Sequence, residues 1–229
     1  FSTDQLVLMM ETLSESGSID ISTFLQKFQS YEKRGMIGLT TEHKNIDEYT
    51  KEIVSSCESL SDPAKRSFDQ YIKYNNPDTS ISTCDNTPLI RCVMIALYND
   101  WDSYSFASVM STHADHRCIS SGVVISSIIR SMLIGCSTDI SEIVTDTASM
   151  ILSMKKMPNQ RDINEYMRFT SEGYCSDLSL LNLKGGNTKH TYKCMAQAIY
   201  ALGELVKEKA ESSPLVACDI FNKILSEIY

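Results

Sequence analysis

Residues 111–118, with the sequence STHADHRC, bring several chemically capable side chains together and hold two of the chain's four histidines. Three kinds of chemistry are open at this point. His113, His116 and Cys118 are candidate zinc ligands, a Cys/His pair is a candidate nucleophile, and the segment is a candidate rim of a ligand pocket. Spacings of three and two residues are not a familiar zinc pattern, and a nucleophile needs a base oriented in space. A helix end followed by a polar turn and a new helix is the simpler interpretation, and the spacing favours it.

Two further stretches combine polar turns with a following helix. In CDNTPLIRC, residues 84–92, Pro88 is expected to open a helix, and free amides at a helix start favour anions such as phosphates. Ordinary helix capping is the favoured alternative, because every helix start has such amides. In KGGNTKHTYKC, residues 184–194, no Gly-Lys-Ser/Thr follows the glycine pair, so a turn before a helix is favoured over a phosphate loop.

The elements that must position these residues are helices, because apolar residues recur at helical spacing along nearly the whole chain. The first expected helix ends near Gly17. Further helices are expected over 22–35, Ile53–Leu60, 102–110, 118–133, 191–207 and 214–228. Three more are expected to start at Pro63, Pro88 and Asp139. Their starting or capping residues are expected at Ser22, Asp62, Pro88, Asp102, Asp139 and Ser213. The segment 118–133 is apolar on several faces, which predicts a central buried helix. With no internal repeat and no linker, residues 1–229 are predicted to form a single compact all-α domain of many helices.

Composition excludes several classes of partner. Lys and Arg number 21 against 29 Asp and Glu, and this net charge of −8 opposes binding to nucleic acid. No run of about 18 apolar residues exists, so no membrane span is expected. Eight cysteines without a CxxC pair predict reduced, buried thiols in an intracellular, cytoplasm-like compartment. Because the chain begins at Phe1, a targeting sequence that has been removed is an open alternative.

Five stretches follow one another in an order that resembles one protein family. They are TDQLVLMMETL (3–13), SIDISTFLQKFQSYEKRGMIGL (18–39), DNTPLIR (85–91), STHADHRC (111–118) and HTYKCMAQAIYAL (190–202). Together they resemble the ADP-ribosylglycohydrolase family, which includes the dinitrogenase reductase-activating glycohydrolases and the J1 crystallins. The resemblance implies an all-α fold in which an early T-D-D cluster and a late D-x-D-T motif hold two magnesium ions. It also implies hydrolysis of the glycosidic link between ADP-ribose and a protein side chain.

The metal motifs depart from the family pattern. The related branch reads D-D-T-D-Q at the early motif, but here Phe1 and Ser2 stand where the acidic ligands belong. Thr3 and Asp4 are therefore expected to be remnants of a metal site, and no D-x-D-T follows residues 219–229. We expect residues 1–229 to lack the N-terminal and C-terminal metal-binding segments, with no catalytic residue and no secure metal ligand. Mg²⁺ is expected only if a longer chain restores the acidic motifs.

The resemblance also predicts a vestigial ADP-ribose pocket formed by Asn86, Thr87 and His113. Asn86 and Arg91 match the family pattern, whereas Thr87 replaces a pocket glycine and is expected to narrow the space for a diphosphate. His113 stands at the ADP-ribose-contacting histidine of the family, and His190 replaces a tyrosine.

Three functions follow from these expectations. The leading one is a hydrolytically inactive member that acts as a structural or binding subunit, in a protein complex or a homo-oligomer. The second is an active Mg²⁺-dependent hydrolase that removes ADP-ribose from modified proteins, if the chain is a fragment. The third is a non-catalytic reader of ADP-ribose or of an ADP-ribosylated protein.

Overall fold

The computed structural model describes residues 2–35, 46–55, 62–75, 82–134, 139–153, 160–182 and 189–209. Across these ranges the elements are helices and there is no strand, so the predicted all-α class is confirmed. The helices form two compact units, Phe1–Ser126 and Ser127–Tyr229, and each is described by itself. The single domain expected from the sequence remains a prediction.

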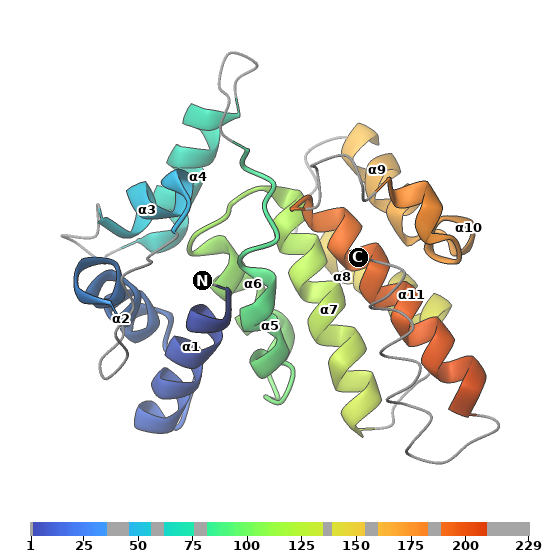
Figure 1. Ribbon diagram of the computed structural model, residues 1–229, viewed down its shortest axis with the longest axis horizontal. Coiled ribbons are helices and arrows are strands. Elements are labelled where there is room, and N and C mark those ends of the chain that lie inside the picture. The colour runs from blue at the N-terminus through green and yellow to red at the C-terminus, as the bar shows by residue number, and fades with distance from the viewer. Residues whose placement is uncertain are drawn as a thin grey trace. The chain divides into compact units, whose positions relative to one another are not determined.

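The first unit contains six helices and the start of a seventh among its described residues. They are α1 (Ser2–Ser16), α2 (Ile21–Arg34), α3 (Glu48–Ser55), α4 (Pro63–Tyr74), α5 (Leu89–Ile95), α6 (Trp101–Met110) and α7 (His116–Ile134), which continues into the second unit (Figure 1). α1 packs against α2 and α5, and α5 packs in turn against α6. α3 packs against both α2 and α4, and α4 also contacts α6.

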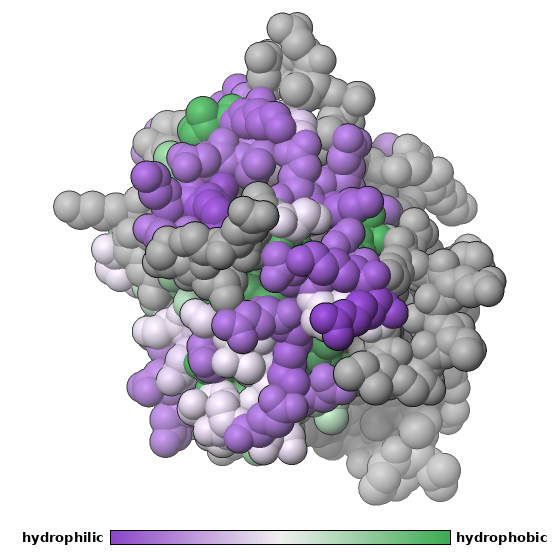
Figure 2. Space-filling model, turned by 90° about the vertical axis from the view of Figure 1, so that its left-hand side faces the viewer, coloured by the Kyte–Doolittle hydropathy of each residue, from purple (hydrophilic) through white to green (hydrophobic). Residues whose placement is uncertain are grey.

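The core of the first unit is built around α1 and α2. The four expected core residues of α2 are all buried: Phe24, Leu25, Phe28 and Tyr31. Leu8 and Met9 of α1 pack in the same cluster. The apolar stripe that predicted this helix is therefore the face that it turns inward. Figure 2 views the first unit from the side of α2 and α3, where the described surface is mainly hydrophilic.

Three helix starts differ from the sequence prediction. The cap of α2 is Asp20 rather than Ser22, because the Asp20 carboxylate accepts a hydrogen bond from the Ser22 backbone N–H at 2.9 Å. α6 begins directly after Asp100, so that Asp102 lies in its first turn instead of capping it. α7 begins at His116 rather than at Cys118. In each case the prediction placed the helix start one or two residues too late.

Other helix ends are confirmed. Asp62 caps α4 by accepting from the Lys65 N–H at 2.9 Å, and Pro63 takes the first helical position. Gly35 ends α2 with a φ of 78°, in the left-handed region that glycine adopts without steric cost. Asp139 accepts from the Ser141 and Glu142 N–H groups at the start of the eighth helix.

The described part of the second unit holds the end of α7 and five further elements. These are α8 (Ile140–Ser153), α9 (Gln160–Thr170), α10 (Glu172–Cys175), the 3₁₀ helix η1 (Leu178–Leu181) and α11 (Thr191–Lys209). α11 packs against α8, α9, α10 and η1. No element between residues 153 and 190 was expected from the sequence. α9 was missed because its sequence is mostly polar and its buried face consists of Tyr166, Phe169 and Thr170.

Three further expectations, on the burial of α7, the thiols and a membrane span, are tested in the described ranges. α7 is buried over its first turns, but Met132 and Leu133 near its end are 40% and 59% exposed, so it is not buried throughout. Five cysteines are described and all are free thiols, four of them buried. No helix within these ranges is long and apolar enough to cross a membrane. The expectations at Cys57, Leu60, Asn76–Asp78, the Gly185–Gly186 pair and the helix over 214–228 lie outside the described residues.

Candidate functional site

Two of the chemically rich stretches of the sequence meet in the first unit. Thr83 Oγ1 donates a hydrogen bond to Asp115 Oδ2 at 2.8 Å, which joins the segment before α5 to the segment before α7. Cys118 Sγ lies 3.5 Å from the carbonyl oxygen of Thr83 and 3.3 Å from that of Asp85. The stretches CDNTPLIRC and STHADHRC therefore form one site, which we call the two-loop site, made of residues 83–88 and 111–117.

Asp115 is the structural anchor of the two-loop site. Its carboxylate is fully buried and accepts from Thr83 and from the backbone N–H, Nε and Nη2 of Arg117, the last at 2.7 Å. Burial works to raise the pKa of Asp115, but the hydrogen bonds and charge of Arg117, with the charge of His116, hold it below its ordinary value. The side chain is thus an ionised, saturated acceptor that starts α7 and ties the two loops together.

Arg91 is the cation of the site and lies on α5. Its side chain is completely buried, its Nη2 donates to Thr112 Oγ1 at 2.6 Å, and its guanidinium carbon lies 5.1 Å from the centre of the Phe24 ring. Burial lowers the pKa of Arg91 to about 10, against the opposing effect of the Cys92 and Cys118 thiols, so the group remains charged at neutral pH. Among the described residues Arg91 forms no ion pair with a carboxylate, and its Nη1 has no hydrogen-bond partner.

His113 is buried rather than exposed at a pocket rim. The side chain is 1% exposed, and its ring centre lies 5.3 Å from that of Tyr49 on α3. Burial lowers the pKa of His113 and the charge of Arg91 lowers it further, outweighing Asp85 and Asp115, so the imidazole is neutral at physiological pH. Its Nδ1 lies 3.0 Å from Thr112 Oγ1.

Thr112 links Arg91 to His113. Arg91 is only a donor, so Thr112 Oγ1 accepts from Arg91, and its proton and its second lone pair allow a hydrogen bond with His113 Nδ1 in either neutral tautomer. His113 Nε2 is buried and has no partner in the described part of the chain. Two buried nitrogen atoms, Arg91 Nη1 and His113 Nε2, are therefore available at this site.

The remaining predicted ligand contacts lie in the first loop. Thr87 is 7% exposed, and both its N–H and its hydroxyl donate to the Asp85 carboxylate. Asn86 is partly exposed, and it is the most accessible residue between Thr83 and Leu89. α5 begins at Leu89, and Pro88 at its N-cap position provides no side-chain hydrogen bond, so the capping predicted at this turn is replaced by an Asp85 turn. Ligand contact by Asn86, Thr87 and His113 remains a prediction.

The zinc and nucleophile interpretations of STHADHRC are wrong. Within the described ranges no three His, Cys, Asp or Glu side chains lie close enough to hold a metal ion, so His113, His116 and Cys118 form no zinc site. Burial raises the pKa of the Cys118 thiol well above its ordinary value, and the adjacent Cys84 raises it further. A protonated thiol is a poor nucleophile. His116 and Arg117 lie in the first turn of α7, as the simpler interpretation predicted.

The remnants of the early metal motif lie at the start of α1. Thr3 is exposed, and Asp4 is partly buried with its Oδ2 accepting from Tyr31 OH at 2.6 Å. Burial raises the pKa of Tyr31 and the Asp4 carboxylate raises it further, so the phenol stays a donor. Two magnesium ions need several converging carboxylates, and the described residues do not supply such a cluster. The described residues therefore do not by themselves form the family's dimagnesium centre.

The roles of three contributors to the two-loop site were not predicted from the sequence. Asp115 ties the two loops together, Arg91 matches the family pattern but was given no role, and Tyr49 covers His113 from α3. Their roles depend on neighbours far away in the chain, and a lone Tyr in a polar segment gives no signal for such a contact. His190, the other histidine singled out, lies in the second unit, where its ring is stacked 5.8 Å from that of Phe169.

Comparison with known proteins agrees with the all-α fold. The ADP-ribosylglycohydrolase family matches residues 2–215, a range that includes α1 and both loops. No curated protein and no solved structure gives a significant match. Since the family match covers most of the sequence, the chain belongs to the ADP-ribosylglycohydrolase family.

Proposed function

We propose that this chain binds ADP-ribose, free or attached to a protein, at the two-loop site and does not hydrolyse its glycosidic link. One observation carries the proposal. Arg91 is a fully buried cation without a carboxylate partner in the described part of the chain. An isolated buried charge is costly, and proteins normally pair it. The negatively charged diphosphate of ADP-ribose is a fitting partner, since guanidinium and phosphate form charge-assisted, bidentate hydrogen bonds.

The neutral His113 supports the same ligand. Its Nε2 is a second buried polar atom without a partner in the described residues, and Thr112 links the ring to Arg91 through hydrogen bonds of 2.6 and 3.0 Å. A ligand with closely spaced phosphate oxygens and hydroxyl groups bonds to the guanidinium and to the imidazole at once. The diphosphate and pentose hydroxyls of ADP-ribose provide such groups.

Access of a ligand to Arg91 and His113 requires movement of the two loops. Arg91 and His113 are at most 1% exposed, whereas Asn86 is partly exposed. We therefore expect the ligand to meet Asn86 first and to separate the two loops as it binds. The energy used for that opening lowers the observed affinity.

The proposed absence of hydrolysis is supported by the structural roles of nearby carboxylates. Asp4 is bonded to Tyr31, Asp115 is saturated by Thr83 and Arg117, and Asp85 holds the Thr87 turn. Each of these carboxylates therefore already stabilises the fold. We derive no metal-dependent step, because the described residues do not by themselves form a dimagnesium centre.

The test is calorimetric titration of the full chain with ADP-ribose, next to a hydrolysis assay on an ADP-ribosylated protein with Mg²⁺ present. We expect binding in the micromolar range and no release of ADP-ribose. Release at an appreciable rate would establish the hydrolase instead. No binding at millimolar ADP-ribose would contradict the proposal and would favour a role as a structural subunit.

A further inference from the structure

Two cysteine side chains meet at the two-loop site. Cys84 lies in the first loop, and Cys118 follows directly after the second. The Cys118 sulfur faces the backbone on both sides of Cys84, at 3.5 Å from the carbonyl oxygen of Thr83 and 3.3 Å from that of Asp85. The Cys84 side chain is within hydrogen-bonding reach of the Cys118 thiol. The two thiols are thus neighbours, although they come from distant parts of the chain.

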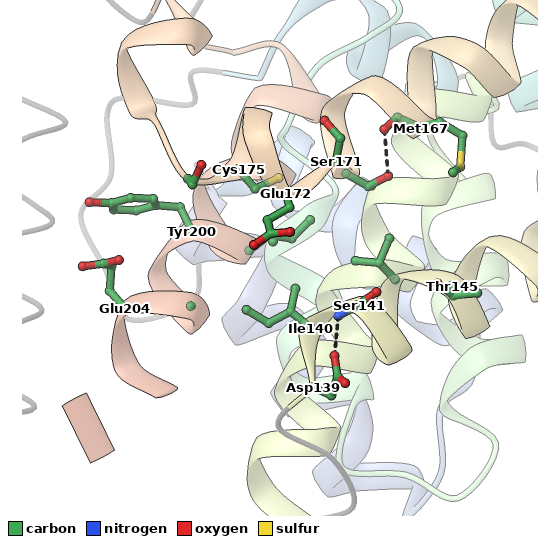
Figure 3. Close-up of a pocket in the computed structure, with 15 residues that line it drawn as sticks. Asp139, Ile140, Ser141, Thr145, Met167, Ser171, Glu172, Cys175, Tyr200 and Glu204 are labelled. Atoms are coloured by element: carbon green, nitrogen blue, oxygen red, sulfur yellow. Dashed lines mark hydrogen bonds between the residues drawn. The ribbon is translucent and has the colours of Figure 1, made fainter. Parts of the chain in front are cut away.

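Cys175 in the second unit provides a contrast. It lies in the wall of a cavity of about 490 Å³ (Figure 3), where its sulfur faces the carbonyl oxygen of Phe169 at 3.0 Å. No second cysteine is among the described residues that line this cavity. At the two-loop site, by contrast, both members of the pair are reduced thiols and neither is in a disulfide. A disulfide between Cys84 and Cys118 therefore joins sulfur atoms that are already neighbours.

Burial and charge decide when this pair reacts. Cys84 is 5% exposed and Cys118 is completely buried. Burial raises the pKa of the Cys118 thiol and keeps it protonated while the loops are closed, and a protonated thiol reacts slowly with oxidants. The charge of Arg117 acts in the opposite direction and favours the thiolate. Separation of the loops removes the burial but not the adjacent cation, so we expect the pair to react when the loops open.

We propose that Cys84 and Cys118 form a reversible disulfide that locks the two loops together, with a peroxide as the oxidant. The thiolate of Cys84, the more accessible residue, attacks a peroxide oxygen, the O–O bond breaks, and a sulfenic acid and hydroxide form. The Cys118 thiolate then attacks the Cys84 sulfur, the S–S bond forms, and the sulfenic oxygen leaves as hydroxide. The two thiol protons convert both hydroxides to water. With hydrogen peroxide, two thiols are oxidised by two electrons and two molecules of water are produced.

The position of the disulfide makes it a regulator of the ligand site. A disulfide holds its two Cα atoms within about 4.4–6.8 Å of one another, which opposes separation of the loops. This consequence rests on the proposed function, in which ADP-ribose reaches the buried Arg91 and His113 only when the loops separate. The oxidised chain is therefore expected to bind ADP-ribose at least about tenfold more weakly than the reduced chain. A transient, redox-sensing disulfide is also compatible with the reducing compartment predicted from the cysteine content.

The first experiment maps the disulfide by mass spectrometry. The full chain is treated with hydrogen peroxide at neutral pH, blocked with iodoacetamide and digested with trypsin without reduction. Cleavage after Lys and Arg places Cys84 in residues 74–91 and Cys118 in residues 118–130, so the bridge joins two distinct peptides. We expect these peptides to be joined in the oxidised chain and separated again by dithiothreitol. Failure to find the joined peptides would overturn the proposal.

The second experiment measures closure of the loops with and without a ligand. Hydrogen exchange of the backbone amides in residues 83–88 and 111–117 should be at least about fivefold slower in the oxidised chain, and unchanged exchange would overturn the lock. Calorimetric titration compares ADP-ribose binding by the two forms, and equal affinity of both would contradict regulation of the site. If the reduced chain does not bind ADP-ribose, the proposed function fails, and hydrogen exchange alone decides whether the disulfide locks the loops.

Serine variants assign these effects to the cysteine pair. Cys84→Ser and Cys118→Ser each remove one sulfur, so peroxide should change neither the loop exchange nor the ADP-ribose affinity of these variants. Both variants keep every methionine, and an effect caused by methionine oxidation would persist in them. Cys194→Ser on α11 is the matched control and should respond to peroxide as the unmodified chain does. A peroxide effect that persists in either loop variant would contradict the proposal, and if one of them fails to fold, the other decides.

Discussion

The guanidinium of Arg91 donates a hydrogen bond of 2.6 Å to the hydroxyl of Thr112, although 21 residues separate them in the chain. This bond joins α5 to the loop after α6. The same hydroxyl lies 3.0 Å from His113 Nδ1 and is hydrogen-bonded to the imidazole as well. One hydroxyl thus links a buried cation to a neutral histidine.

Asp115→Asn is expected to destabilise the first unit by about 2–4 kcal/mol, since it leaves the Arg117 guanidinium without its carboxylate and weakens the bond to Thr83. Urea unfolding at neutral pH measures the loss. The matched control is Asp62→Asn, because asparagine caps a helix about as well as aspartate and a loss under about 0.5 kcal/mol is expected there. Equal losses in both variants would contradict the anchoring role of Asp115.

His113 is expected to make stability depend on pH. Its folded pKa is depressed below the unfolded value of 6.5, so the unfolded chain takes up a proton first as the pH falls. The free energy of unfolding should therefore decrease below pH 6.5, with a slope that approaches about 1.4 kcal/mol per pH unit. The stability contributed by Asp115 is lost only as the pH falls below its unfolded value of 3.8 toward its depressed folded pKa.

The readout is the free energy of unfolding between about pH 6.5 and 4.5, measured in urea. His113→Gln should flatten this decline, because glutamine does not titrate. His190→Gln in the second unit is the control and should retain the decline. A variant at His113 that declines as steeply as the unmodified chain would show that another group causes the pH dependence.

Gly122 on α7 is expected to tolerate no side chain. A Cβ there would lie 2.7 Å from Val109 Cγ2 and 2.9 Å from Cys92 Sγ, closer than van der Waals contact allows. Gly122→Ala should cost about 1–3 kcal/mol through overpacking, despite the better helix propensity of alanine. Gly173→Ala on α10, where a Cβ meets nothing within 4 Å, should be neutral or slightly stabilising. Thermal unfolding of the two variants checks the difference, and a stabilised Gly122→Ala would contradict the close packing of α7.

Removal of divalent metal is expected to leave ADP-ribose binding intact. Asp4 accepts from Tyr31, and the described residues offer no cluster of three metal-ligating side chains. Calorimetric affinities measured in excess EDTA and in Mg²⁺ should agree within about twofold, since the proposed contacts with Arg91, His113 and Asn86 involve no metal ion. A tenfold loss in EDTA that Mg²⁺ restores would show that metal takes part in binding.

The sequence predicts those parts of this molecule that depend on local patterns. The stripe of Phe24, Leu25, Phe28 and Tyr31 is visible at helical spacing, and so is the start of α4 at Asp62–Pro63. Helix caps were misplaced where two candidates lie within two residues, as at Asp20 and Ser22. The choice between them depends on which side chain reaches the free N–H groups.

The candidate site was predicted only in outline. The family resemblance singled out the two loops and gave His113 as a contact of ADP-ribose, which stays a prediction. It did not predict that His113 is buried against Tyr49. The pairing of Thr83 with Asp115 and of Arg91 with Thr112 depends on contacts over 32 and 21 residues. Periodicity within a short window carries no information on such contacts.

The most direct test of the proposed function compares ADP-ribose binding by the unmodified chain, Arg91→Met and Arg168→Met. Methionine keeps much of the length of the buried side chain while removing the cation, and Arg168 is an exposed arginine in the second unit. We expect Arg91→Met to remain folded and to lose at least tenfold in affinity, a loss of about 1.4 kcal/mol, while Arg168→Met binds as the unmodified chain does. Equal affinity of Arg91→Met and the unmodified chain for ADP-ribose would contradict the account.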